Sequence, residues 1–131
     1  METEVLITYW VESSARDFTT MQHLVEKGDY QWALFIGHLV LEKLLKAYYV
    51  KHGDHHPPLS HNLLNIAERA GLTLNPEQKT ELNTISTFNI QARYDTYKSD
   101  FYALCTKDFT DEWIAHIEEF CRWIKDQLSN P

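Results

Sequence analysis

Residues 29–52 decide the fold, and they read DYQWALFIGHLVLEKLLKAYYVKH. At 100° per residue, the apolar side chains of this stretch spread over more than half of the helical circumference. They are Ala33, Leu34, Ile36, Gly37, Val40, Leu41, Leu44, Ala47 and Tyr48. Because such a helix has to be covered by neighbours on several sides, we expect it to lie at the centre of the molecule.

The remaining arc of this helix carries Glu42 and Lys46, with Lys43 at its edge. Glu42 and Lys46 form an acid-before-base pair at i,i+4, the favourable orientation on a helix. A solvated pair of this kind contributes only about 0.2–0.5 kcal/mol to stability. Two interpretations stay open: a solvated pair on the wet edge of the helix, or a functional or dimer-interface role.

Residues 4–27 show the pattern of a helix with one apolar face. This face holds Trp10, Ser14, Phe18, Met21 and Val25. Arg16 and His23 fall on the opposite, solvent side. Gly28 is a suitable C-terminal stop and Asp29 a suitable N-cap for the next helix. The pattern therefore predicts two long antiparallel helices joined by a minimal connection.

The following part of the chain predicts a loop and two further helices. Residues 53–59 contain Gly and two Pro, which interrupt helical structure. Ser60 is a candidate N-cap for a short helix that ends near Gly71. Asn75 is a candidate N-cap for another helix, and Pro76 suits its first turn.

The last third of the chain predicts a long connection and a final helix. Residues 89–107 show no sustained 3.6-residue period, so we expect a connection with at most a helical turn over 101–105. Thr110 is the expected N-cap of a last helix that runs to about Leu128. The sequence thus predicts an all-α fold, an antiparallel up-and-down bundle of four to five helices in one domain over residues 1–131.

Composition and charge exclude several classes of protein. The formal net charge of −7 disfavours bulk DNA binding, which needs clustered Lys and Arg. No apolar run approaches the roughly 18 residues of a membrane helix, so no membrane association is expected. The first residues do not resemble a signal peptide, and a cytoplasmic location is expected. Cys105 and Cys121 have neither CxxC nor metal-ligand spacing, and we expect both to be reduced and structural.

Four of the seven histidines, His52, His55, His56 and His61, fall within ten positions. Adjacent His55 and His56 cannot readily bind one ion with good geometry, and no acid or Cys stands beside them at helical ligand spacing. We therefore expect a solvated polar loop and no metal site.

Two other positions are candidates for ligand binding. His61 follows the predicted N-cap, so it either caps locally or reaches towards the central helix. Arg93 and Tyr94 lie in the stretch QARYDTYKSD. An Arg held by Tyr stacking can bind phosphate with its planar donors. Alternatively, Arg93 is structural and bonds helix-terminal carbonyls, Asp95 or Glu42.

Several fragments in this order resemble a HEPN domain, the helical domain named for higher eukaryotes and prokaryotes nucleotide binding. They are Asp17, the stretch GDYQWALFIGHLVLEKLLKA from residue 28, HNLLNIA from residue 61, and Ala92-Arg93-Tyr94. The resemblance implies an antiparallel bundle of four or five helices, usually a homodimer, encoded beside a minimal nucleotidyltransferase. The HEPN protein of such a pair binds a nucleotide or substrate, or acts as a toxin. No cofactor is expected.

Many members of this family are metal-independent ribonucleases with an Arg and a His separated by four to six residues, near the start of the last long helix. This sequence departs from that motif. The corresponding positions are Lys98, Ser99 and Asp100 after Arg93, and Gln127, Leu128 and Ser129 after Arg122. The literal spacing occurs at Arg16 and His23, which fall in the first predicted helix.

The leading hypothesis is a non-catalytic, nucleotide- or partner-binding protein in a toxin–antitoxin-like system. Its expected ligand-binding residues are Glu42, Lys43, Lys46, His61, Arg93 and Tyr94. One alternative is an RNA-cleaving enzyme that uses Arg93 with a displaced His such as His61. Another is a purely structural partner of a nucleotidyltransferase, with a contact patch of exposed tyrosines at 94, 97 and 102.

Overall fold

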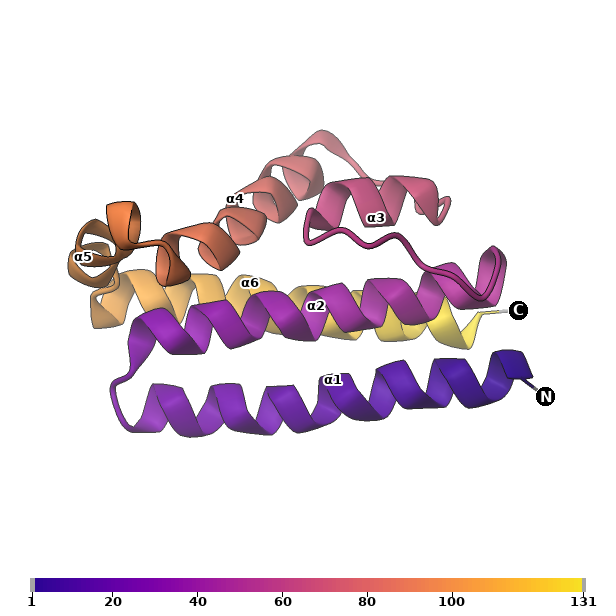
Figure 1. The fold of residues 1–131 in the computed structure, drawn as a ribbon, viewed down its shortest axis with the longest axis horizontal. Helices are drawn as coiled ribbons and strands as arrows, with labels where there is room; N and C mark the ends of the chain where they lie inside the picture. The colour runs from indigo at the N-terminus through magenta and orange to yellow at the C-terminus, as the bar shows by residue number, and fades with distance from the viewer. Residues whose placement is uncertain (1, 131) are drawn as a thin grey trace.

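The computed structural model describes residues 2–130, which form helices and connecting loops (Figure 1). The described helices are α1 (Glu2–Glu26), α2 (Tyr30–His52), α3 (Leu63–Arg69), α4 (Pro76–Arg93), α5 (Asp95–Leu104) and α6 (Lys107–Ser129). No strand occurs within this range.

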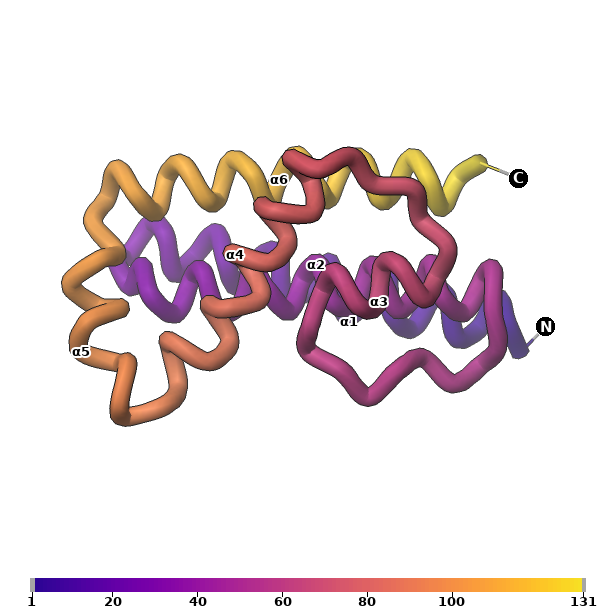
Figure 2. The backbone as a smooth tube through the Cα atoms, turned by 90° about the horizontal axis from the view of Figure 1, so that it is seen from above, coloured from indigo at the N-terminus to yellow at the C-terminus, as the bar shows by residue number. Residues whose placement is uncertain are grey.

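The four long helices α1, α2, α4 and α6 alternate in direction, while α3 and α5 are short and lie within the connections (Figure 1). The start of α1 and the end of α6 are at the same end of the bundle. Seen from above, α4 runs obliquely to α2 and α6 (Figure 2). The predicted all-α, up-and-down helical bundle is confirmed.

Helix α2 is the centre of this bundle, as its apolar pattern predicts. More than half of its 23 residues are buried, and it contacts each of the other described helices. Its Gly37 lies where three helices meet: a Cβ built there would be 2.6 Å from Ile117 Cδ1 and 3.1 Å from Met21 Sδ. The Ser14 hydroxyl also donates to the Val40 carbonyl at 2.9 Å, which links α1 to α2.

Two predicted helix boundaries follow from local chemistry and are confirmed. Gly28 adopts a φ of 79°, the left-handed conformation that ends a helix, directly after α1. Asn75 caps α4 through a reciprocal capping box with Gln78, and Pro76 occupies the first helical position. These contacts set where the hairpin turns and where α4 begins.

The prediction of a long connection over residues 89–107 is wrong, because α4 continues to Arg93 and α5 covers Asp95–Leu104. Within α5 only Phe101 is buried. A helix with one buried residue has no repeating apolar face, so its sequence lacks the 3.6-residue period.

Two predicted N-caps are also wrong. Asn62, not Ser60, caps α3 and accepts from Asn65 N at 2.9 Å. Thr106, not Thr110, caps α6, and its hydroxyl accepts from Phe109 N at 3.2 Å. Thr110 is fully buried one turn inside the helix. In both cases two potential caps stand within four residues, so the local sequence does not select between them.

Cys105 and Cys121 are free and buried, in agreement with the prediction. Burial raises the pKa of the Cys105 thiol to about 11 and that of Cys121 to about 12. Across residues 2–130, no helix has the length and apolar character needed to cross a membrane.

Candidate functional site

Glu42 and Lys46 are buried, which corrects the interpretation of this arc as the wet edge of α2. Their exposed fractions are 5% and 8%. Lys46 Nζ donates to Glu42 Oε2 at 3.0 Å and lies 5.4 Å from the centre of the Trp10 ring. The helical pattern cannot show this burial, because Trp10 of α1 and the loop before α3 provide the cover.

His61 reaches across to α2, as one of the two interpretations of its sequence position anticipates. Its Nδ1 lies 2.8 Å from Glu42 Oε1. A carboxylate only accepts hydrogen bonds, so Nδ1 carries the hydrogen and Nε2 is the nitrogen left for another partner. The side chain of His61 is 63% exposed, whereas that of Glu42 is 6% exposed. A buried carboxylate therefore orients an accessible imidazole.

His38 is a second histidine of this cluster, and the sequence interpretation missed it. It is fully buried on α2, one helical turn before Glu42. Its Nε2 donates to the backbone carbonyl of His61 at 2.8 Å, and its Nδ1 has no partner among the described residues. Burial lowers the pKa of His38 from its ordinary value of 6.5, which keeps the imidazole neutral. The sequence feature that could have identified His38 is its i,i+4 spacing to Glu42.

Arg93 ends α4 and is anchored through one nitrogen. Its Nε donates to the Asn89 carbonyl at 3.0 Å and to Asn89 Oδ1 at 2.9 Å. The guanidinium stacks at 5.3 Å from the Tyr94 ring and 5.8 Å from the Phe35 ring. Within residues 2–130 its two Nη groups bond no side chain or carbonyl, and Arg93 makes no ion pair with Asp95 or Glu42.

His61 and Arg93 line the same groove, which has a volume of about 500 Å³. Its other lining residues are Asn62, Asn83, Ser86, Thr87, Asn89, Ile90 and Tyr94. Most of these lie on one face of α4 at helical spacing, a polar pattern that sequence reasoning could have detected. The groove combines a fork of donors, an imidazole nitrogen, amide and hydroxyl groups and an exposed aromatic ring.

The structure separates Lys43 and Lys46 from this groove. Lys43 Nζ donates to Asp17 Oδ2 of α1 at 2.6 Å, and Lys46 is held by Glu42. Neither lysine lines the groove. Of the six residues expected to bind ligand, His61, Arg93 and Tyr94 therefore lie together, Glu42 supports His61, and the two lysines point to other partners.

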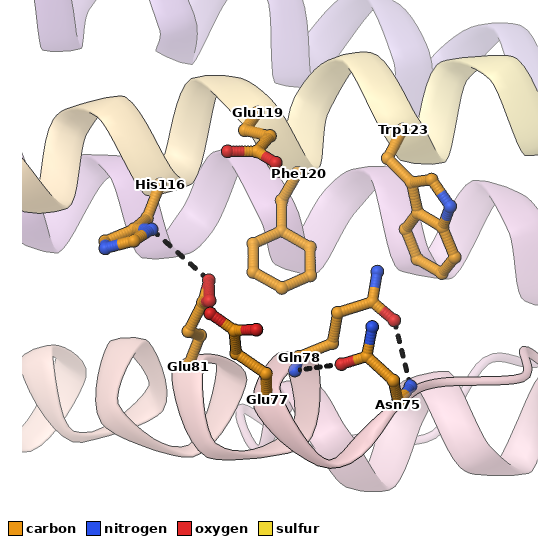
Figure 3. A pocket seen from close by; sticks show the side chains of 8 residues that line it. All are labelled: Asn75, Glu77, Gln78, Glu81, His116, Glu119, Phe120 and Trp123. Atoms are coloured by element: carbon orange, nitrogen blue, oxygen red, sulfur yellow. Dashed lines mark hydrogen bonds and ion pairs between the residues drawn. The ribbon is translucent and has the colours of Figure 1, made fainter.

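A smaller groove of about 240 Å³ lies between α4 and α6 (Figure 3). Its lining residues are Asn75, Glu77, Gln78, Glu81, His116, Glu119, Phe120 and Trp123. His116 Nδ1 and Glu81 Oε2 are paired across it at 3.3 Å, and two further carboxylates line the same space (Figure 3). This negative charge disfavours a phosphate, so the groove at Arg93 is the better anion site.

The histidine-rich segment contacts the start of α1 and the end of α2. His55 Nε2 bonds the Thr3 hydroxyl at 2.7 Å, and the His52 ring stacks 4.2 Å from that of Tyr48. In residues 2–130, no three His, Cys, Asp or Glu side chains gather in a way that could hold a metal ion.

The family model of the HEPN domain matches residues 7–127 of the 131 residues. No curated protein and no solved structure matches. The matched region begins within α1 and ends within α6, so it contains both α2 and the groove at Arg93. The chain belongs to the HEPN domain family.

Proposed function

We propose that this HEPN protein binds a nucleotide in the groove between His61 and Arg93, with the phosphate at these two residues and the base against Tyr94. One observation carries the proposal. Glu42 holds one ring nitrogen of His61, Asn89 holds Nε of Arg93, and both side chains line a common groove. Both side chains are held in place before a ligand arrives, which lowers the entropic cost of binding.

The chemistry of the groove suits a nucleotide. The planar guanidinium of Arg93 matches two phosphate oxygens, and the imidazole of His61 is a polar group in the same groove. Tyr94 is 52% exposed and offers a stacking face for a base. Asn62 and Asn83 supply amides for the polar edge of the base. The acidic protein relies on this local arrangement and not on its overall field.

Titration calorimetry with AMP tests the proposal. Arg93→Ala should weaken binding about 10- to 100-fold, the range expected for losing hydrogen bonds to a charged group. Arg93→Lys should recover only part of the affinity, because an ammonium lacks the planar fork. Arg16→Ala is the matched control, since Arg16 is exposed on α1 and should leave binding unchanged. Equal AMP affinity in the wild type and Arg93→Ala would reject the site.

A second function, RNA cleavage without a metal, is favoured by the Glu42–His61 contact. A histidine oriented by a buried carboxylate is an arrangement suited to general acid or base catalysis. Under this alternative, the protein cleaves RNA in EDTA, His61→Ala abolishes cleavage and Glu42→Gln reduces it. If the wild-type protein binds AMP but leaves RNA intact, the cleavage function is rejected and nucleotide binding is the function that remains.

The cellular setting of the protein is proposed from the family resemblance. We place it in the cytoplasm as a homodimer that partners a minimal nucleotidyltransferase in a toxin–antitoxin-like system. Tyr94, Tyr97 and Tyr102 are 52%, 48% and 66% exposed and form the proposed contact patch. Co-expression with a nucleotidyltransferase encoded next to it, followed by affinity purification, tests this partnership. Replacing Tyr97 and Tyr102 with Ser should abolish co-purification.

A further inference from the structure

His38 is an energetically unfavourable residue at its position in the core. It is fully buried, and the Nδ1 lone pair has no hydrogen-bond partner among the described residues. An unpaired buried polar atom destabilises a fold, and a hydrocarbon side chain at this position would avoid that penalty. A hydrocarbon could not, however, donate to the carbonyl of His61.

His61 itself lies outside any helix, between the proline-containing loop and the N-cap of α3. Its backbone carbonyl accepts from His38 Nε2 at 2.8 Å, and its imidazole donates to Glu42 Oε1 at 2.8 Å. His38 and Glu42 are one turn apart on α2 and both are buried. The rigid central helix therefore holds one loop residue at two points, main chain and side chain.

The two contacts act together on the direction of the imidazole. A hydrogen bond to the ring alone leaves the backbone of residue 61 able to rotate, and the ring can then follow it out towards solvent. With the carbonyl also held, the ring has one position in which Nδ1 meets Glu42 and Nε2 is left to the groove. The centroids of the two histidine rings lie 6.3 Å apart, so the His38 ring limits how far the His61 ring can move.

We infer that His38 is a positioning residue for His61: its neutral Nε2–H holds the His61 carbonyl so that Glu42 can fix the imidazole with Nε2 towards the ligand groove. The inference rests on the proposed function for its effect on binding. Its structural part, the orientation of the His61 ring, holds whether or not a nucleotide is the ligand.

Two amide substitutions test this geometry because they differ in reach. The amide nitrogen of Gln occupies the place of His Nε2, whereas that of Asn reaches only the place of Nδ1. His38→Gln should therefore keep the bond to the His61 carbonyl, and His38→Asn should lose it. His38→Leu removes both nitrogens and reports on packing alone.

The first readout needs no ligand. Long-range ¹H–¹⁵N spectra of the imidazoles report which ring nitrogen of His61 carries the hydrogen, with His61→Ala used to assign its signals. Wild-type protein and His38→Gln should show the Nδ1–H form of neutral His61 as the main species. His38→Asn and His38→Leu should show a mixture with the Nε2–H form that free imidazoles prefer. An unchanged His61 spectrum in both latter variants would overturn the inference.

The second readout is AMP affinity by calorimetry. His38→Asn and His38→Leu should bind AMP about tenfold more weakly, which corresponds to the net free energy of about one hydrogen bond that holds His61 in place. His38→Gln should bind AMP with an affinity near that of the wild type. Thermal unfolding of each variant, measured alongside, separates a loss of AMP binding by folded protein from a loss of the fold. If Arg93→Ala and His61→Ala leave AMP binding intact, the proposed function fails, while the spectra still decide the role of His38. If all His38 variants bind AMP equally, the positioning effect on the ligand is absent.

Discussion

Glu42 connects the central helix to the candidate site through direct contacts. Its two carboxylate oxygens bond Lys46 Nζ at 3.0 Å and His61 Nδ1 at 2.8 Å, and His38 Nε2 lies 3.7 Å from the same carboxylate. With an exposed fraction of 5%, this carboxylate is stable in the interior only because it has these partners. The same atoms therefore hold the core and orient the imidazole.

The first prediction concerns the loss of this carboxylate. Glu42→Ala should lower the free energy of unfolding by about 3 kcal/mol, because it leaves the buried ammonium of Lys46 without a counter-charge. Glu68→Ala is the matched control: it removes an exposed acid paired with Lys79 at 3.6 Å and should change stability by less than about 0.5 kcal/mol. Urea denaturation measures both. Equal stability changes in the two variants would contradict the burial of the pair.

The second prediction is a dependence of stability on pH through His38. Burial lowers its pKa in the folded state below the ordinary 6.5, so the unfolded state binds more protons as the pH falls below that value. Stability from this residue is complete above pH 6.5 and is lost as the pH falls towards the folded-state pKa. His38→Gln, which cannot titrate, should lose less stability than the wild type between pH 7.5 and 5.5 in urea denaturation. Parallel losses in both proteins would show that His38 does not contribute.

At the scale of whole helices, the sequence predicts elements well where one face is apolar and a cap is clear. The one-faced helix over residues 4–27, which ends before Gly28, and the helix that begins after the N-cap Asn75 belong to this class. Prediction from the sequence fails for α5, whose only buried residue is Phe101, and for the burial of Glu42. Glu42 is bonded by the imidazole of His61, 19 residues further along the chain, and its partner Lys46 is covered by Trp10 of α1. No local pattern encodes such contacts.

A third prediction belongs to the packing of α2 against α1 and α6. Gly37→Ala should destabilise the protein by roughly 1–3 kcal/mol, because the new methyl group overlaps Ile117 Cδ1 and outweighs the helix propensity of Ala. Adding Ile117→Val, which removes that carbon, should recover part of the loss. Thermal unfolding of the single and double variants measures this coupling. A single variant as stable as the wild type would show that the helices can separate at Gly37 without cost.

At the scale of the molecule, α2 contacts each of the other described helices, and the groove at Arg93 combines residues from α4 and from the loop before α3. The sequence predicts His61, Arg93 and Tyr94 as candidates, and the structure shows that they share one groove. The sequence alone could not show that Lys43 lies outside this groove, because its partner Asp17 is on another helix. Which side of α2 each residue meets is decided by the topology of the bundle.

A fourth prediction tests how cooperative the bundle is. Cys105 and Cys121 are 6% and 3% exposed, and burial raises the pKa of both thiols, to about 11 and about 12. Since the thiolate is the reactive form, both should react slowly with a disulfide reagent in the native protein and rapidly in denaturing urea. Both should become reactive over the same urea range as the loss of helical circular dichroism. Early reaction of Cys105 alone would instead show that α5 opens separately.

The central claim is that a nucleotide binds in the groove between His61 and Arg93, and amide chemical-shift mapping with AMP tests it most directly. A titration of ¹⁵N-labelled protein should shift the amides that line this groove, from residues 61–62 and 83–94, and leave those of the acidic groove between α4 and α6 unchanged. Arg93→Ala should need about 10- to 100-fold more AMP to produce the same shifts. Shifts centred on Glu77, Glu81 and His116, or no shifts at saturating AMP, would contradict the claim.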